Sequence, residues 1–303
     1  MFRLALAMKR NRCLLAHFHD AHSLAIGSVA SSLAKVPIRI ISRRVDFPLK
    51  KNLFSKRKYG KNVDAIIAIS EGVKEVLMKG GIPEEIIEVI PSGIDFSPYD
   101  EASSSDYLRQ EFSFAPDDYL VGIVAHLAEH KGHKYLISAT KILKEHTDKI
   151  KVIIVGGGPL KFELDKQAEE MKVKDIVYFL GFREDIPQIL SSLDLFVLSS
   201  YLEGMGSSLL DAMACRLPVV ATKAGGIPEV VVHRKTGLLV PARSPSYLAR
   251  AILKLYEDRD LASRLGQKGY EVVKQKFSAE AMAAKIIDLY EKIAKKKGLK
   301  LNQ

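Results

Sequence analysis

Short runs rich in Val, Ile and Leu alternate with amphipathic stretches along most of this chain, and this alternation constrains the fold most strongly. Several runs are continuously apolar, which is typical of strands buried on both faces, as in parallel sheets. The expected strands are residues 12–17, 38–42, 64–70, 120–126, 151–155, 176–180, 195–199, 218–222 and 237–240. The expected helices are residues 21–35, 71–79, 133–146, 161–171, 207–215, 246–257 and 278–297. Alternating strands and helices predict a doubly wound α/β architecture.

A stretch rich in Pro, Gly and Ser interrupts the alternation near residues 91–118. These residue types favour turns and linkers, so we expect a boundary between two domains there. The first domain is predicted to comprise residues 1–97 and the second residues 98–277. Residues 278–303 are predicted to form one further amphipathic helix.

The net charge of +10 is concentrated in the N-terminal part of the 303 residues. Such an excess favours an anionic partner, either a phosphorylated substrate, an acidic membrane surface or nucleic acid, although a solvated surface explains it equally well. Two cysteines, Cys13 and Cys215, cannot form a disulfide framework and suit a reducing compartment. No apolar run approaches the roughly 18–20 residues that span a bilayer. The basic residues of the first twelve positions favour a helix over a signal peptide, so we expect a cytoplasmic protein.

The first candidate site is the sequence LEGMGSSLLDAMA at residues 202–214, which follows an expected strand and opens an expected helix. Unpaired N–H groups and the helix dipole favour oxyanions and sugar hydroxyls at such a helix start. Gly204 and Gly206 would let a ligand approach the backbone closely. Glu203 and Asp211 are eight positions apart and share a side if the helix begins early. The alternative is a helix capped by one of the serines, with a solvated acid.

The second candidate site is the sequence VAHLAEHKGH at residues 124–133, also between a strand and a helix. Ligands of open α/β sheets bind at the carboxyl ends of the strands. His126, Glu129, His130 and Lys131 are expected at that edge, and a lysine is a suitable point charge for a phosphate. The alternative is a polar turn that caps the helix.

A glycine run, Gly156 to Gly158, follows a buried strand within VIIVGGGPLK. It does not match the dinucleotide fingerprint G-x-G-x-x-G, because the sixth position is Lys161 and Pro159 interrupts the motif. A tight turn near a ligand and a purely structural turn both remain consistent with it.

The sequence HFHDAH follows the first expected strand and places three histidines and an aspartate close together. Alternate residues on an extended chain point to opposite faces, which disfavours metal binding by His17, His19, Asp20 and His22. We expect no metal here, since nearby cysteine ligands are also absent. A histidine that contacts a ligand at the strand end and a purely structural histidine remain the alternatives.

Residues 42–62 combine many Lys and Arg residues with interleaved aromatic and aliphatic ones. Anionic lipid surfaces attract such a composition, so this segment is predicted to contact a membrane peripherally on its inner face. An exposed loop is the alternative. We expect no nucleic-acid binding, because no recognition motif accompanies the basic residues.

Taken together, these motifs resemble the family-4 retaining glycosyltransferases of the GT-B fold. The matching strings are HFHDAHS, SRRVDFP, DAIIAISEGVKEVLMKGGI, VIPSGIDFSPYD, VGIVAHLAEHKGHKYLI, VIIVGGGPLKFEL, VYFLGFREDIPQILSSLDLFVLSSYLEGMGSSLLDAMA and LPVVATKAGGIPEVVVHRKTGLLVP. They occur in the family's order from about His17 to the final helix.

The resemblance implies two Rossmann-like domains facing a cleft, with the last helix, residues 278–303, crossing back to the first domain. It implies a nucleotide-sugar donor bound as UDP-, GDP- or ADP-sugar by the C-terminal domain, a glycan or glycolipid acceptor, and no cofactor or metal. Family members begin with further βα units, so the N-terminal domain is expected to be incomplete. A catalytically silent nucleotide-sugar-binding module or fragment is therefore one alternative, and an NAD(P)-dependent oxidoreductase is another.

The family's catalytic positions correspond to His19, Lys131 and Glu203 in this sequence. The resemblance implies donor binding by His126, Glu129, Gly157, Phe182, Gly204, Met205, Gly206, Ser207 and Asp211. Asp211 stands where the family more often has Glu, and His126 stands where it usually has Arg. Arg216 replaces a usual Gly after the helix, which predicts strain if the backbone is left-handed there.

Overall fold

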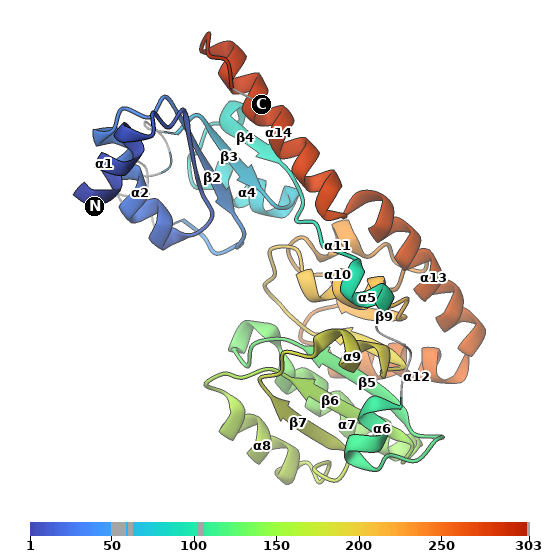
Figure 1. Ribbon diagram of the computed structural model, residues 1–303. Coiled ribbons are helices and arrows are strands. Elements are labelled where there is room, and N and C mark those ends of the chain that lie inside the picture. The colour runs from blue at the N-terminus through green and yellow to red at the C-terminus, as the bar shows by residue number, and fades with distance from the viewer. Residues whose placement is uncertain (50–58, 60–62, 102–105, 302–303) are drawn as a thin grey trace. The chain divides into compact units, whose positions relative to one another are not determined.

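The computed structural model describes residues 1–49, 59, 63–101 and 106–301. The chain divides into two compact units (Figure 1). The first unit combines Met1–Gly93 with Ala279–Gln303, and the second unit is Ile94–Ser278. The C-terminal helix therefore belongs to the first unit, although almost 200 residues of the second unit separate the two parts of its sequence.

A parallel four-stranded sheet in the order β1-β2-β3-β4 forms the centre of the first unit. The strands are β1 (Leu15–Phe18), β2 (Ile38–Arg43), β3 (Ala65–Ala68) and β4 (Ile87–Val89). The helices are α1 (Phe2–Arg10), α2 (Ala21–Leu33), α4 (Glu71–Lys79) and α14 (Ala279–Lys296), and a 3₁₀ turn covers Glu84–Ile86. Leu289 and Ile293 of α14 belong to the same buried apolar cluster as Ile38 and Ile40 of β2, so burial of apolar side chains attaches the C-terminal helix to this sheet.

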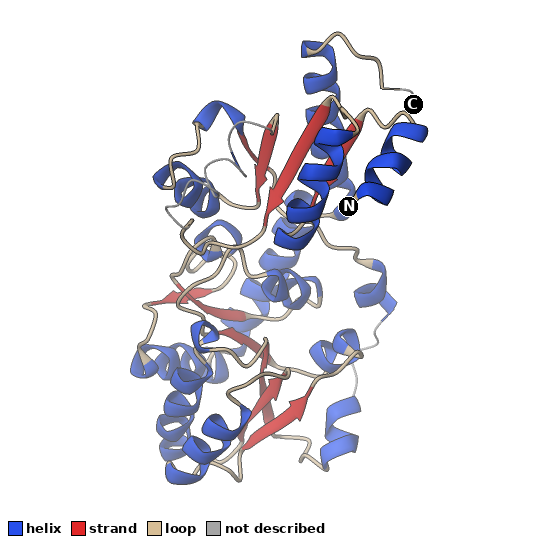
Figure 2. Cartoon of the chain, turned by 90° about the vertical axis from the view of Figure 1, so that its left-hand side faces the viewer, coloured by secondary structure: helices blue, strands red, loops and turns tan. Residues whose placement is uncertain are grey.

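A parallel six-stranded sheet in the order β10-β9-β8-β5-β6-β7 forms the centre of the second unit. The strands are β5 (Tyr119–Val124), β6 (Ile150–Val155), β7 (Val177–Gly181), β8 (Leu195–Leu198), β9 (Val219–Thr222) and β10 (Leu238–Val240). The helices are α5 (Ser97–Glu101), α6 (Tyr107–Phe112), α7 (His133–His146), α8 (Lys161–Glu170), α9 (Ile186–Ser191), α10 (Ser207–Ala214), α11 (Ile227–Val230), α12 (Pro245–Glu257) and α13 (Arg259–Lys276), with a 3₁₀ turn at Glu129–Lys131. Figure 2 shows helices on both sides of this sheet.

The strand order reverses at β5 in the second unit. From β5 the chain proceeds outward through β6 and β7, then crosses back to β8 on the other side of β5. A reversal of this kind separates the two loops that follow the central strands, and open α/β sheets bind ligands in the resulting crevice. The loops after β5 and β8, which carry the two candidate sites, therefore meet at the carboxyl edge of the sheet.

Several sequence predictions about the elements need correction or addition. The first strand begins at Leu15 rather than at residue 12. Strand β4 and the helices α5, α6, α9, α11 and α13 were not predicted. Helix α13 contains Gly266 and Gly269, which lower helix propensity. A Cβ atom at Gly266 would lie 2.1 Å from the carbonyl oxygen of Arg216, so close packing requires this glycine. Arg216 itself has a φ of 58°, in the left-handed region, so the condition under which strain was expected at this position is met.

Candidate functional site

Lys131 and Glu203, from the two separate candidate motifs, form an ion pair in the second unit. The Lys131 Nζ atom lies 2.6 Å from Oε2 of Glu203, and the side chains are only 20% and 12% exposed. The hydroxyl of Ser200 donates to the same carboxylate oxygen over 3.1 Å. A cation and an anion thus meet where the ends of β5 and β8 are adjacent.

Backbone contacts lock the two loops that carry this ion pair. The Ser199 hydroxyl donates to the carbonyl of Lys131 over 3.0 Å, and the N–H of Tyr201 donates to the carbonyl of His130 over 2.9 Å. Gly132 has a φ of 70°, and a Cβ atom there would lie 2.2 Å from the carbonyl oxygen of Ser199. Only glycine allows this approach, so the Lys131 backbone is held directly beside the end of β8.

Helix α10 begins at Ser207, after Gly206 in a left-handed conformation. The alternative of a serine cap does not hold, because Gly206 is the N-cap and no side-chain oxygen accepts the first N–H groups. Glu203 precedes the helix, so it does not share a helical face with Asp211. Ser207 is exposed while Met205 is 2% exposed, so the methionine packs as a core residue and the serine borders solvent. The uncapped helix start leaves N–H donors for an oxyanion.

Asp211 lies one turn into α10 and is largely withdrawn from water. Burial raises the pKa of its carboxyl group, an effect that a hydrogen bond from Tyr99 opposes. The Tyr99 hydroxyl donates to Oδ1 of Asp211 over 2.8 Å. The sequence analysis did not nominate Tyr99, since no local pattern links residues 112 positions apart.

The glycine run after β6 forms a turn packed against the loop after β5. Gly156 has a φ of 137°, and a Cβ atom there would lie 2.1 Å from the carbonyl oxygen of Ala125. The carbonyl of Gly157 accepts the N–H of Leu127 over 2.9 Å. Phe182 follows β7, is 77% exposed, and its Cβ would be 4.0 Å from a Cβ on Gly157. Gly157 and Phe182 therefore lie side by side at the same edge, with an aromatic face open to solvent.

The remaining residues of the loop after β5 differ in exposure. His126 and Glu129 are exposed, and Glu129 accepts a 3.4 Å contact from Lys134. His133, which the sequence analysis did not single out, is 1% exposed, and neither ring nitrogen has a hydrogen-bond partner among the described residues. Burial, together with the charges of Lys131 and its neighbours, lowers the pKa of His133 to about 4.

His17 and His19 lie at the end of β1 in the first unit. His17 is hydrogen-bonded to Tyr290 Oη at 2.6 Å and to Ser42 Oγ at 2.8 Å, so both of its ring nitrogens are engaged. Burial, His19 and Arg44 lower the pKa of His17 to about 4. The His19 ring is exposed and its centroid lies 4.0 Å from that of His17. Partial desolvation and the charge of Arg44 lower the pKa of His19 as well.

The polar residues after β1 form a helix cap instead of a metal site. The Asp20 carboxylate accepts the N–H groups of His22 and Ser23 over 2.7 and 2.8 Å, and so begins α2. Across the described parts of the chain, no group of three or more His, Cys, Asp and Glu side chains is arranged to hold a metal ion.

Much of the basic segment at residues 42–62 lies outside the described residues. Within the described part, the Arg43 guanidinium donates to the carbonyls of Val45 and Phe47, at 3.0 and 2.6 Å, and to Tyr59. This arginine therefore holds its own loop.

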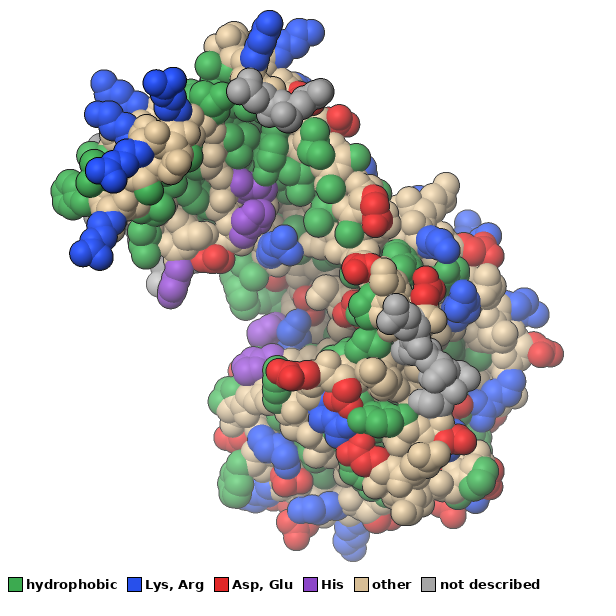
Figure 3. All heavy atoms as spheres, viewed as in Figure 1, with side chains coloured by type: hydrophobic (Ala, Val, Ile, Leu, Met, Phe, Trp, Pro, Cys, Tyr) green, Lys and Arg blue, Asp and Glu red, His purple; other side chains and the backbone are tan. Residues whose placement is uncertain are grey.

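Figure 3 shows Lys and Arg side chains gathered with hydrophobic ones over α1 and α2. None of the helices within the described ranges is long and apolar enough to cross a bilayer.

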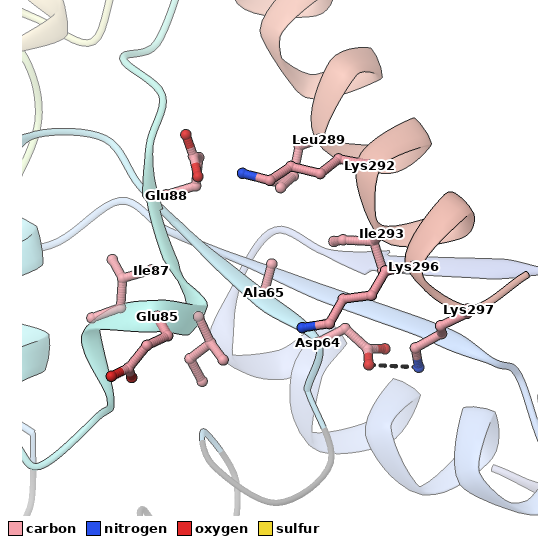
Figure 4. Close-up of a pocket in the computed structure, with 11 residues that line it drawn as sticks. Asp64, Ala65, Glu85, Ile87, Glu88, Leu289, Lys292, Ile293, Lys296 and Lys297 are labelled. Atoms are coloured by element: carbon pink, nitrogen blue, oxygen red, sulfur yellow. Dashed lines mark ion pairs between the residues drawn. The ribbon is translucent and has the colours of Figure 1, made fainter.

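A further cavity lies in the first unit between β4 and α14 (Figure 4). Lys292 and Lys296 extend from the helix over it, while Glu88 extends from the strand. Lys297 forms an ion pair of 2.6 Å with Asp64 at its edge. None of the site residues nominated from the sequence lines this cavity.

Two family models match the chain. The model described as "Glycosyl transferases group 1" matches residues 104–272, and the one described as "Glycosyltransferase Family 4" matches residues 1–97. The first match covers all six strands of the second unit, including both loops that carry the ion pair.

Similar proteins include two curated relatives. GDP-mannose-dependent alpha-(1-6)-phosphatidylinositol monomannoside mannosyltransferase of Mycobacterium tuberculosis is 31% identical over 244 residues, which cover 77% of this chain and 63% of that protein. D-inositol 3-phosphate glycosyltransferase of Corynebacterium jeikeium is 31% identical over 290 residues, which cover 91% and 66%. The chain thus spans less than two thirds of the length of these relatives.

Solved structures with the same fold include Anabaena HepE in complex with UDP and glucose. Its TM-score is 0.86 at 25% identity, over 96% of this chain and 82% of that chain. Sucrose-phosphate synthase of Thermosynechococcus elongatus has a TM-score of 0.80 at 21% identity, over 95% and 75%. The second likeness concerns the fold alone.

Proposed function

Because the chain belongs to the glycosyl transferases group 1 and has their GT-B fold, we propose that it transfers a sugar from a nucleoside-diphosphate sugar with retention of configuration. The observation that carries this proposal is the ion pair of Lys131 and Glu203 beside the uncapped start of α10. A diphosphate needs cations and N–H donors, and a sugar needs hydrogen-bond acceptors. This edge of the second unit offers both.

The chemistry of the proposed reaction fits these residues. The bond between the anomeric carbon and the phosphate oxygen breaks, and the bond to the acceptor oxygen forms on the same face. The acceptor proton passes to the departing phosphate, so no nucleophilic side chain is needed. Negative charge grows on the leaving group, where Lys131 and the N–H groups of α10 stabilise it. In this proposal Glu203 accepts hydrogen bonds from the donor sugar and Asp211 from the ribose.

The remaining donor contacts are proposed on the basis of their position at the same edge. His126 and Glu129 follow β5, Gly157 follows β6, and Phe182 follows β7. His19 lies in the first unit, and its role toward the donor sugar stays a prediction.

The donor and acceptor classes are proposed from the similar proteins. One relative is named for GDP-mannose and a phosphatidylinositol mannoside, and one structural neighbour was solved with UDP. We infer a nucleotide sugar as donor and a cell-envelope glycan or glycolipid as acceptor, without a metal or cofactor. Contact of residues 42–62 with an anionic membrane is part of this proposal.

A donor screen tests the proposal. Calorimetry with UDP-, GDP- and ADP-sugars is expected to show binding by at least one, and Lys131→Ala is expected to weaken this binding about 10- to 100-fold. Glu145→Gln, which removes an exposed carboxylate near the end of α7, is the control and is expected to bind normally. Binding without donor hydrolysis or transfer to a lipid-linked acceptor would favour a silent nucleotide-sugar-binding module. A parent chain that binds none of the three donor classes would refute the proposal.

A further inference from the structure

Tyr99, which no motif singles out, reaches the acid proposed to bind the ribose. It lies in the short helix α5, and its hydroxyl donates to Oδ1 of Asp211 on α10 over 2.8 Å. Both side chains are partly buried. A hydrogen bond to a carboxylate in such a site is stronger than one in water, because fewer solvent molecules compete for the oxygen.

Two contacts hold the segment that precedes Tyr99. The Asp95 carboxylate accepts the N–H and the hydroxyl of Ser97 over 2.9 and 2.8 Å, which begins α5. The Phe96 ring packs edge-on against Tyr270 of α13, with 6.1 Å between the centroids. The start of α5, which carries Tyr99, is therefore anchored by a helix cap and by packing against α13.

The contact leaves the Asp211 carboxylate with one committed oxygen. A carboxylate accepts several hydrogen bonds through its two oxygens, so Oδ2 keeps its full acceptor capacity. Among the described residues, Tyr99 is the one side chain that donates to Asp211. The short aspartate side chain has only two rotatable bonds, so fixing one oxygen fixes the direction of the other.

We propose that Tyr99 is a positioning residue for donor binding, which holds Asp211 so that its second oxygen accepts one ribose hydroxyl of the nucleoside diphosphate. This inference rests on the proposed function and adds the group that orients the ribose-binding acid. A competing role is also testable: if Tyr99 occupied the place of the ribose hydroxyl, its removal would strengthen donor binding.

Calorimetry with ribose-modified ligands separates these roles. The probes are UDP, GDP and ADP, each with its 2′-deoxy and 3′-deoxy form. The unsubstituted protein is expected to bind at least one deoxy form more weakly than the intact nucleotide. Asp211→Asn is expected to remove this difference in affinity. Tyr99→Phe is expected to weaken binding of the intact nucleotide about 3- to 10-fold, the worth of one hydrogen bond, and to leave binding of the discriminated deoxy form unchanged.

Tyr107→Phe is the matched control, because the Tyr107 hydroxyl donates to Oδ2 of Asp185 over 2.6 Å in the same unit. This variant loses a similar bond away from α10 and is expected to keep the discrimination. Equal weakening of intact and deoxy forms by Tyr99→Phe would show a merely structural role and overturn the inference, as would tighter binding of the intact nucleotide. A parent protein that binds none of UDP, GDP and ADP would overturn the proposed function itself.

Discussion

Removing Glu203 is expected to strengthen binding of a nucleoside diphosphate while removing Lys131 weakens it. In the structure Lys131 is already paired with Glu203 at 2.6 Å, so a diphosphate must compete with this carboxylate for the ammonium group. The carboxylate also repels the incoming anion. Glu203→Gln keeps the size of the side chain and removes its charge, which leaves Lys131 available to the phosphates.

The magnitudes follow from the exposure of the pair. An ion pair with partly exposed side chains contributes up to about 1 kcal/mol, so its loss in Glu203→Gln is expected to tighten UDP or GDP binding about 2- to 5-fold. A charge-assisted hydrogen bond to a phosphate contributes about 1.5–3 kcal/mol, so Lys131→Ala is expected to weaken binding about 10- to 100-fold. The sugar-linked nucleotide is expected to lose its advantage over the free nucleotide in Glu203→Gln.

Isothermal titration with UDP, GDP and their sugar-linked forms measures these differences. Glu145→Gln removes one negative charge from the same unit and controls for the change in overall charge; its binding is expected to match the parent. If Glu203→Gln weakened binding of the free nucleotide as much as Lys131→Ala, the two residues would act as one binding unit. The reasoning from competition would then be refuted.

Three further outcomes are expected. Gly132 and Gly181 both have a φ of 70°, but only Gly132 faces a carbonyl, that of Ser199. In urea unfolding, Gly181→Ala is expected to lower the free energy of unfolding by roughly 1–2 kcal/mol and Gly132→Ala by at least twice as much. Equal losses would contradict the close approach of Gly132 to Ser199. The unfolded state protonates His133 below about pH 6.5 and the folded state only below about pH 4, so stability is expected to fall as pH drops through this window, by about 1.4 kcal/mol per pH unit at most. His133→Leu should remove this fall in stability at low pH. A stability profile of the variant that runs parallel to that of the parent protein would contradict the prediction. Residues 42–62 should cause the chain to sediment with acidic vesicles but not with neutral ones, and indifference to lipid charge would end the membrane proposal.

The sequence predicted those parts of the site that local pattern and topology determine. Lys131 and Glu203 each follow a continuously apolar strand, and the carboxyl ends of parallel strands share one edge of a sheet. The sequence alone was therefore enough to predict that these two side chains lie at the same edge. The GT-B fold could also be predicted from the sequence. Each motif alone is weak evidence, but their order along the chain is specific to the family.

Contacts between segments that are distant in the sequence could not be predicted in this way. Tyr99 contacts Asp211, and His17 contacts Tyr290, only because the fold brings together elements that are far apart in the sequence. No periodicity within any of these segments encodes the pairing. The guanidinium of Arg43 was grouped with lipid-binding charges because composition does not show that it bonds to its own loop. Helix α13 was not predicted because it contains Gly266, a poor helix former. Close packing against the Arg216 backbone requires a glycine at this position.

A crystal structure of the chain with a bound nucleoside-diphosphate sugar tests the central claim most directly. The diphosphate is expected within hydrogen-bond distance of the Lys131 ammonium group and of the first N–H groups of α10, with Glu203 turned from the lysine to the sugar. A diphosphate bound elsewhere, with the Lys131–Glu203 pair intact, would contradict it.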